Sequence, residues 1–216
     1  MAKKLQIDFV SDVVCPWCAI GLGGLETALQ RLDGEVEAEI AFQPFELNPG
    51  MAEAGENLEE HIVEKYGPRS PEEAEAIRAR IKDRAAAVGF AINRNGESRI
   101  YNTFDAHRLL HWAGLEGKQA ALKHALLKAY FTDGLNVADR AVLVAKAAEA
   151  GLDPKAAGEV LESGRYAEDV RKEERAWLEA GIHSVPAIIV NRQYLISGGQ
   201  PPEVFEESLR QIAAKG

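Results

Sequence analysis

The sequence has few cysteines and no long apolar run. Its 216 residues include only two cysteines, three positions apart. A disulfide between such near neighbours would close too small a loop to constrain the unfolded chain much. No apolar run is long enough to span a bilayer, and there is no second cysteine pair to complete a four-ligand zinc site. These absences leave a chain whose stability comes from an ordinary apolar core.

The sequence also lacks any run of Lys and Arg, and its net charge is -9. This argues against partners bound mainly by basic surfaces, such as nucleic acid or an anionic membrane. Hydrophobic residues make up 46% of the chain and charged residues 27%, which is typical of a folded globular protein rather than a disordered one. We therefore expect small-molecule or protein partners. The sequence does not indicate an oligomeric state, and a dimer is compatible with it.

The N-terminal residues Met1–Lys4 are basic, but the apolar stretch after them is interrupted by Gln6 and Asp8. That stretch is too polar for the core of a signal peptide. We therefore expect a cytoplasmic protein. Cytosolic thiols are held mostly reduced, so a cysteine pair there is more often catalytic or metal-binding than structural.

Both cysteines lie in the segment Ser11–Cys18, where Pro16 and Trp17 separate Cys15 from Cys18. The alternating residues before it predict a strand over Leu5–Val10, and the pattern after it predicts a helix over Ala19–Leu32. A thiol at a helix N-terminus is stabilised as the thiolate by the unpaired N–H groups and the helix dipole. The segment therefore suggests thiol–disulfide chemistry.

The rest of the chain predicts a mixed α/β protein with a helical middle. Val36–Leu47 predicts a second strand, so the opening is β-α-β with parallel strands. The middle shows helical signals, except for Gly89–Arg99, which we expect to be extended. The expected helices of the middle are Leu58–Tyr66, 71–88, Asn102–Leu115, Lys118–Phe131, Arg140–Ala150 and a short helix after Pro154.

The last part of the chain predicts one more helix, then a hairpin and a final helix. A charged helix is expected from Tyr166 to Ala180, strands over Ala187–Val190 and Tyr194–Ile196, and a helix over Glu203–Ala213. We expect three parts: an N-terminal α/β half over residues 1–51, a helical insertion over 52–165 and a C-terminal half over 166–216.

A Cys-Pro-Trp-Cys motif after a strand, with Val185-Pro186 just before a later strand, resembles the thioredoxin fold. The fold class expected is α/β: a thioredoxin fold, β-α-β then β-β-α, interrupted by an all-helical insertion. That insertion looks like the DsbA-like branch of the superfamily. Within the branch, the segments Asp12–Cys18, Asn102–Leu110 and Ser184–Pro186 resemble the FrnE-type proteins. The resemblance covers essentially the whole chain.

This resemblance implies a thiol–disulfide oxidoreductase that reduces, forms or isomerises disulfides in protein or small-thiol substrates. Cys15 would be the exposed attacking thiol, and Cys18, one turn inside, would resolve the mixed disulfide. Val185 and a cis Pro186 would lie against the pair and meet the substrate. Pro16 and Trp17 would tune the reduction potential and form an apolar rim for the substrate. No His lies between the cysteines, so we expect a less oxidising pair.

The architecture also looks like that of kappa-class glutathione transferases and 2-hydroxychromene-2-carboxylate isomerases. These relatives place a serine where Cys15 stands, so this chain departs from them there. No tightly bound cofactor is implied, but glutathione stays open as a co-substrate. Its candidate binding residues are Asn102 and Gly198, Gly199 and Gln200. A third alternative is a chaperone-like binding protein without catalysis.

Other interpretations of single residues remain open. His107 and His111 are four positions apart and could complete a zinc site with the two cysteines, although helical His residues more often face solvent or pack quietly. The two thiols could also be buried and inert. Asp12 could carry a proton near Cys15, but we expect it to be a turn or capping residue. Asn102 is first of all expected to cap a helix, and His183 could reach the site or lie at its rim.

Overall fold

A four-stranded sheet organises the computed structural model, which describes residues 2–93 and 97–215. Its strands, in spatial order, are β2 (Val36–Pro44), β1 (Lys3–Ser11), β5 (Ala187–Val190) and β6 (Tyr194–Ser197). β1 pairs parallel with β2 and antiparallel with β5, and β5 and β6 form an antiparallel hairpin. The predicted β-α-β opening and the C-terminal hairpin are therefore confirmed.

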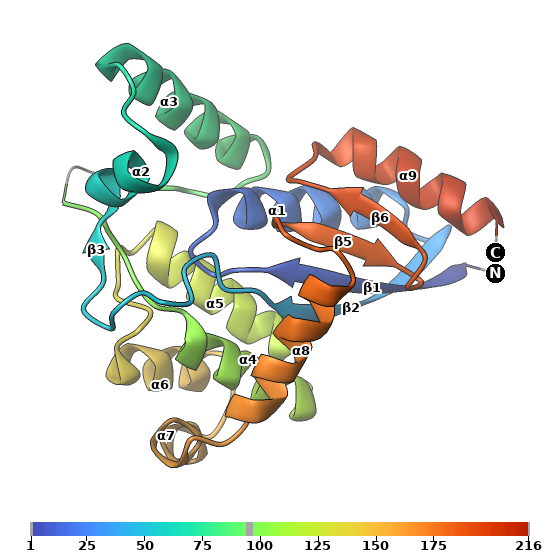
Figure 1. Cartoon of the computed structure of the whole chain (residues 1–216). Coiled ribbons are helices and arrows are strands. Elements are labelled where there is room, and N and C mark those ends of the chain that lie inside the picture. The colour runs from blue at the N-terminus through green and yellow to red at the C-terminus, as the bar shows by residue number, and fades with distance from the viewer. Residues whose placement is uncertain (1, 94–96, 216) are drawn as a thin grey trace.

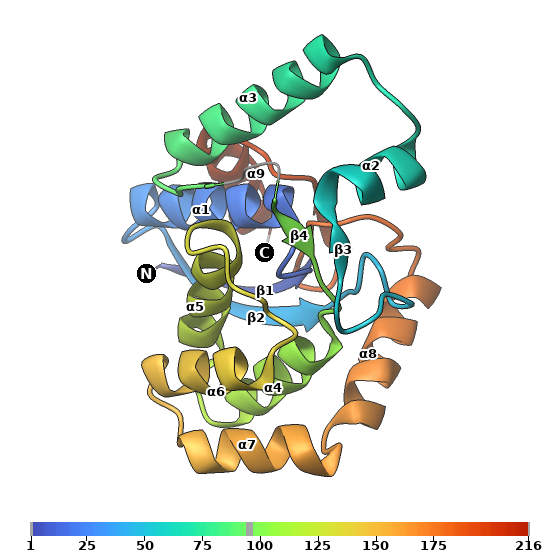
Figure 2. The ribbon, with the colours of Figure 1, turned by 90° about the vertical axis from the view of Figure 1, so that its left-hand side faces the viewer.

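Helices cover both faces of this sheet (Figures 1 and 2). On one face lie α1 (Pro16–Arg31) and α9 (Pro202–Lys215), with α3 (Pro71–Ala87) packed on α1. On the other lie α4 (Phe104–Leu115), α5 (Gln119–Phe131) and α8 (Ala167–Glu179). The main core joins the sheet to both layers, and the ring of Phe9 meets that of Phe42 edge-on within it. None of the helices over residues 2–93 and 97–215 is both long and apolar enough to cross a bilayer.

Three further helices, α2 (Leu58–Tyr66), α6 (Arg140–Glu149) and α7 (Pro154–Ser163), complete the insertion between β2 and α8. The insertion also holds a short antiparallel pair, β3 (Glu56–Asn57) with β4 (Arg99–Ile100). β4 begins at the end of the stretch expected to be extended, of which residues 94–96 lie outside the described residues. The insertion is therefore predominantly but not entirely helical.

β2 ends at Pro44, three residues before the predicted Leu47. The chain leaves the sheet there because the Leu47 N–H donates a hydrogen bond of 2.8 Å to the Asp12 carboxylate instead of to a neighbouring strand. α1 begins at Pro16, earlier than the predicted Ala19, with Cys15 as its N-cap. Both differences bring the two loops at this edge of the sheet together.

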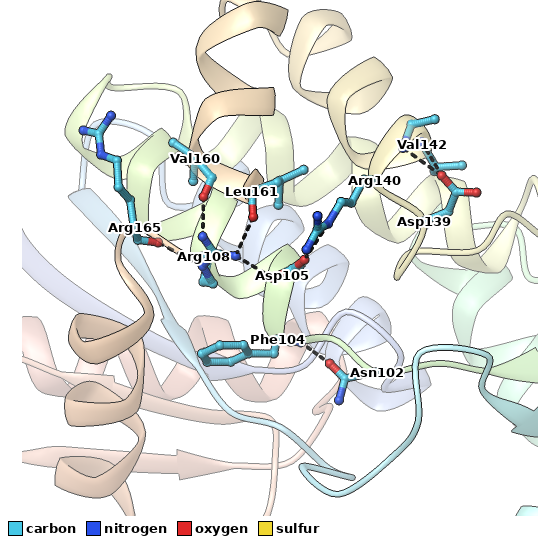
Figure 3. Close-up of polar contacts among 11 residues, drawn as sticks. Asn102, Phe104, Asp105, Arg108, Asp139, Arg140, Val142, Val160, Leu161 and Arg165 are labelled. Atoms are coloured by element: carbon cyan, nitrogen blue, oxygen red, sulfur yellow. Dashed lines mark hydrogen bonds and ion pairs between the residues drawn. The ribbon is translucent and has the colours of Figure 1, made fainter. Parts of the chain in front are cut away.

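A buried arginine holds α4 in place. Arg108 is 3% exposed, and its guanidinium donates to the carbonyl oxygens of Val160 and Leu161, in the last turn of α7, and of Arg165 (Figure 3). The last four carbonyls of a helix have no partner within the helix, and a cation there also offsets the helix dipole. Asp105, one turn earlier on α4, accepts a fourth bond of 2.6 Å. The orientation of α4 is thereby fixed, including that of the neighbouring His107.

The glycines of α1 allow close packing against the loop between β6 and α9. A Cβ added at Gly24 would lie 2.7 Å from the Gln200 carbonyl oxygen, and one at Gly21 would lie 3.1 Å from the Pro186 ring. Both positions are in a helix, where alanine would otherwise be favoured. The glycines are therefore explained by the close approach of this loop and of Pro186 to the start of α1.

We predict opposite effects for the same substitution at two helical glycines. Gly24→Ala should lower the free energy of unfolding by about 1–3 kcal/mol, because the new methyl group meets backbone. The matched control, Gly158→Ala in α7, has no neighbouring atom within 4 Å of the added Cβ and should raise stability by up to about 1 kcal/mol. Urea denaturation of both variants measures the two values, and equal shifts would contradict the close packing at Gly24.

Candidate active site

Cys15 and Cys18 lie at the start of α1 and are free thiols. Cys15 is the N-cap residue in extended backbone conformation, and its carbonyl oxygen accepts the N–H groups of Cys18 and Ala19 at 3.1 and 3.3 Å. No side chain caps this helix end. Cys15 therefore stands at the N-terminus of the helix, as the sequence predicts.

Cys15 is less accessible than the resemblance implies. It is 4% exposed, while Cys18 is fully buried. The expectation of an exposed attacking thiol is wrong for this conformation, because the Val185–Pro186 loop covers it: Sγ of Cys15 lies 3.8 Å from the Val185 carbonyl oxygen. The Val185–Pro186 peptide bond is cis, as predicted. The structure thus brings together residues that are 170 positions apart.

The loop Gly198–Gln200 borders the same group. A Cβ added at Gly199 would lie 2.7 Å from the Trp17 carbonyl oxygen, and the Gly198 N–H donates to the Pro186 carbonyl oxygen at 2.9 Å. The Gln200 side chain donates to the Ser197 carbonyl oxygen. The N–H groups of Gly198 and Gln200 are used within the protein, so the expected carboxylate site of this loop would have to rely on other donors.

Asn102 is engaged by backbone groups of the insertion. Its Nδ2 donates to the Met51 carbonyl oxygen at 3.0 Å, and its Oδ1 accepts the Phe104 N–H at 2.9 Å at the start of α4. The Asn102 side chain does accept the first N–H of α4, but the N-cap residue is Thr103, so the expected N-cap position is wrong by one residue. A role of Asn102 in binding glutathione stays a prediction.

Asp12 is the first buried charge beneath the cysteines. It is fully buried, its Oδ2 accepts the Leu47 N–H at 2.8 Å, and its Oδ1 lies 3.4 Å from Nε2 of His107. Burial raises the pKa of Asp12, but His107, the Leu47 N–H and Thr103 outweigh it and hold that pKa below its usual value. The expectation of a turn residue is confirmed, because the Asp12 carbonyl oxygen accepts the Cys15 N–H at 3.4 Å. The expectation of a capping side chain is wrong, because the carboxylate does not cap α1 and turns inward toward the insertion.

His107 and His111 turn to carboxylates. His107 is 2% exposed and faces Asp12, while Nδ1 of His111 lies 3.2 Å from Glu173. The Glu173 carboxylate raises the pKa of His111 above its usual value. Across residues 2–93 and 97–215, no three Cys, His, Asp or Glu side chains come close enough to hold a metal ion. The zinc alternative therefore finds no ligand set there.

Lys123 is the site residue that the sequence analysis missed. It lies on α5 of the insertion and is 1% exposed. Burial lowers the pKa of Lys123, while Cys18, Asp12 and Cys15 raise it through their charges. One signal was present: Leu126 and Leu127, three and four positions further along, share its helical face, so a lysine there is expected to be buried.

The buried thiol of Cys18 ionises with difficulty. Burial raises the pKa of Cys18 well above its usual range, and the neighbouring Cys15 raises it further by a hydrogen bond and by charge. The charge of Lys123 and a backbone hydrogen bond at Asp12 act in the opposite direction. The inner thiol is therefore a weak acid with one nearby buried cation.

A second buried acidic group lies between β2 and α8. Arg171 bridges Glu46 and Glu174, and its guanidinium stacks 3.8 Å from the Phe104 ring centre. Burial and the neighbouring Glu174 raise the pKa of Glu46 to about 7, against the opposing charges of Arg171 and His107. One oxygen of each carboxylate has no hydrogen-bond partner. Glu46 therefore exchanges a proton near neutral pH.

A redox-type cysteine pair at the start of a helix, beside a cis proline and under a mixed sheet, defines this molecule as a thioredoxin-fold protein with a helical insertion. The family model of the DSBA-like thioredoxin domain matches residues 6–210. The chain therefore belongs to the DSBA-like thioredoxin domain family.

Two similar proteins cover almost the whole chain. The crystal structure of a probable DsbA oxidoreductase from Streptomyces coelicolor is 35% identical with a TM-score of 0.91, covering 98% of this chain and 91% of that one. The uncharacterized protein YwbO of Bacillus subtilis is 28% identical over 207 residues, 95% of this chain and 96% of its own.

A more distant structure shares the fold. The cytosolic disulfide reductase DsbM from Pseudomonas aeruginosa, solved with GSH, is 18% identical with a TM-score of 0.65, covering 97% of this chain and 99% of that one. At this identity the likeness concerns the fold alone.

The raised pKa of Glu46 predicts a pH-dependent stability. A group whose pKa is higher in the folded state than its usual 4.5 stabilises the fold fully below that value, and this contribution is lost as pH rises through about 7. The stabilising contribution that is lost amounts to at most about 3 kcal/mol, and part of it belongs to the neighbouring Glu174. Glu46→Gln mimics the protonated form. Relative to wild type, its free energy of unfolding should therefore rise by about 1–3 kcal/mol between pH 5 and pH 8.

Urea denaturation of both proteins at the two pH values gives this difference. Glu179→Gln, at the exposed end of α8, is the matched control and should show no such change. A Glu46→Gln variant whose offset from wild type is the same at pH 5 and pH 8 would show that Glu46 does not titrate in this range.

Proposed function

We propose that this protein is a thiol–disulfide oxidoreductase that attacks with Cys15 and resolves with Cys18. The observation that carries the proposal is the geometry at the start of α1. There Cys15 caps the helix at 3.8 Å from the Val185 carbonyl oxygen, and a second free thiol is buried one turn inside. The membership of the DSBA-like family supports it.

The reaction divides into two exchanges. The thiolate of Cys15 attacks one sulfur of a substrate disulfide, and the other substrate sulfur leaves as a thiolate that takes up a proton. The thiolate of Cys18 then attacks the Cys15 sulfur of the mixed disulfide. The pair closes into a disulfide, two electrons have passed to the substrate, and a second substrate thiol is released. The reverse sequence oxidises a dithiol substrate.

A substrate can reach Cys15 only if the Val185–Pro186 loop moves or if the substrate segment is narrow. Since only 4% of Cys15 is exposed and the Val185 carbonyl faces its sulfur, a disulfide reaches it only if this contact gives way. Trp17 follows Cys15 by two residues, and the centre of its ring lies 5.5 Å from the Arg80 guanidinium. We propose protein disulfides or small-molecule disulfides as substrates, met by Trp17, Pro16 and the Val185–Pro186 loop.

We further propose a cytoplasmic, FrnE-type enzyme with a comparatively reducing cysteine pair. Support comes from the sequence, because no His lies between the cysteines to stabilise a thiolate there. A reduction potential near −270 mV would support a reductant and one near −120 mV an oxidant.

Glutathione as a co-substrate stays a prediction. A glutathione-transferase activity that survives in Cys18→Ser but is lost in Cys15→Ser would favour the kappa-class alternative, because that chemistry does not cycle a disulfide. A chaperone-like protein would instead keep its activity in both variants.

We predict that replacing either cysteine removes the activity, but that only one of the two variants accumulates a mixed disulfide. In an insulin-reduction assay, Cys15→Ser and Cys18→Ser should each lose activity by at least about a hundredfold, because the two thiols act as a unit. Only Cys18→Ser should form a stable mixed disulfide with a small disulfide, visible as added mass on the intact protein. The double variant sets the background. Equal activity of wild type and both single variants would exclude redox catalysis.

A further inference from the structure

The second exchange poses a problem that the cysteine pair alone does not solve. It needs Cys18 as the thiolate, yet Cys18 is fully buried and burial raises its pKa well above the usual range. An ionised sulfur without water around it needs another source of stabilisation. The inference that follows rests on the function proposed above, because it concerns the resolving step of that reaction.

Formation of the mixed disulfide changes the surroundings of Cys18. In the dithiol, Cys15 raises the pKa of Cys18 by a hydrogen bond and by its charge. Once Cys15 is bonded to the substrate it has neither a proton nor a charge, so both effects end. Burial then opposes ionisation, and the Lys123 charge and the backbone hydrogen bond at Asp12 favour it. The charge of Lys123 therefore has a larger share in setting the pKa of Cys18 at the step where the thiolate is needed.

The position of Lys123 suits this role. It comes from α5 of the insertion, is 1% exposed and lines the same small cavity as His107. His107 lies 3.4 Å from the carboxylate of Asp12, the residue whose carbonyl oxygen accepts the N–H of Cys15. The charges of Cys18, Asp12 and Cys15 act on that of Lys123 in this cluster. In the described part of the chain the Asp12 carboxylate pairs with His107 at 3.4 Å rather than with Lys123, so the charge of Lys123 is not consumed by a close ion pair. Attraction between opposite charges is also stronger where water is excluded.

The surroundings explain how a buried ammonium group is tolerated. The Asp12 carboxylate lies nearby, and the Phe42 ring centre lies 5.9 Å from Nζ. A cavity of about 10 Å³, lined among others by Lys123, His107, His111 and Glu173, has room for about one water molecule. Asp12 is in turn held by His107 at 3.4 Å. The surroundings of the Lys123 ammonium group therefore come from three elements outside α1: Asp12 from the loop after β1, His107 from α4 and Phe42 from β2.

We propose that Lys123 is a positioning residue of the resolving step: its ammonium group stabilises the thiolate of Cys18 in the mixed disulfide. Cys18 gives up a proton, its sulfur bonds to that of Cys15, the bond from Cys15 to the substrate breaks, and the leaving substrate sulfur takes up a proton. Lys123 itself neither loses nor gains an atom. Through this residue the insertion takes part in the redox chemistry.

The aromatic disulfide DTNB separates the two exchanges in a stopped-flow experiment. The reduced protein releases a first coloured thiol when Cys15 attacks, at a rate that depends on reagent concentration, and a second when Cys18 resolves, at a rate that does not. Lys123→Met removes the charge but keeps the length of the side chain. Each unit by which the pKa of Cys18 rises lowers its thiolate fraction tenfold, and the higher nucleophilicity returns about threefold.

We expect the second phase of Lys123→Met to be at least about threefold slower at pH 7 and its pH profile to move to higher pH. The first phase should change less than the second. Lys128→Met, the same substitution at an exposed position of α5, is the matched control and should behave as wild type. Lys123→Arg keeps the charge and should retain the wild-type pH profile if the larger group is accommodated. If Lys123→Met does not fold, Lys123→Gln replaces it.

Each remaining outcome separates the two hypotheses. If the second phase of Lys123→Met matches that of Lys128→Met, or if both phases fall equally, the role of Lys123 is wrong while two-phase release still supports the oxidoreductase. If wild-type protein releases no coloured thiol, or only the first, the proposed function itself is wrong.

Discussion

The pairing of β1 on both of its edges is the constraint on which the site depends. Ser11 pairs with Pro44 of β2, and Val10 pairs with Ala187 of β5 in the antiparallel direction. The residues that follow β1 and those that precede β5 must therefore leave the sheet at the same edge. This places the Cys15 sulfur against the Val185 carbonyl oxygen. A shift of one residue in the β1–β5 register would turn the side chains to the opposite faces and separate the two loops.

The part of the site that lies in short local patterns could be predicted from the sequence. A cysteine pair between a predicted strand and a predicted helix shows where the reactive thiols lie. The Val-Pro dipeptide before a predicted β-hairpin shows which loop packs against them. These features depend on neighbours in the chain, or on one pairing of strands that the hairpin pattern specifies.

The buried charges could not be predicted in the same way. Asp12, His107 and Lys123 meet only because α4 and α5 pack against β2 in one orientation, which Arg108 fixes through its bonds to the end of α7. Nothing in the spacing of the three residues encodes that orientation. The general preference of charged residues for the surface gives no sign that these three are buried. The apolar neighbours of Lys123 on α5 were the one local sign to the contrary.

The buried groups form an alternating series of acids and bases that reaches from α8 to the cysteines. The charge of His107 acts on Glu46 and on Asp12, and the charge of Asp12 acts on Lys123, which acts on Cys18. Each charge in this series therefore acts on the ionisation of a neighbouring buried group. Reduction of the disulfide to two thiols adds an ionisable group at one end of this series. The ionisation of the inner thiol therefore depends on charges that the insertion and the loop after β1 bring to it.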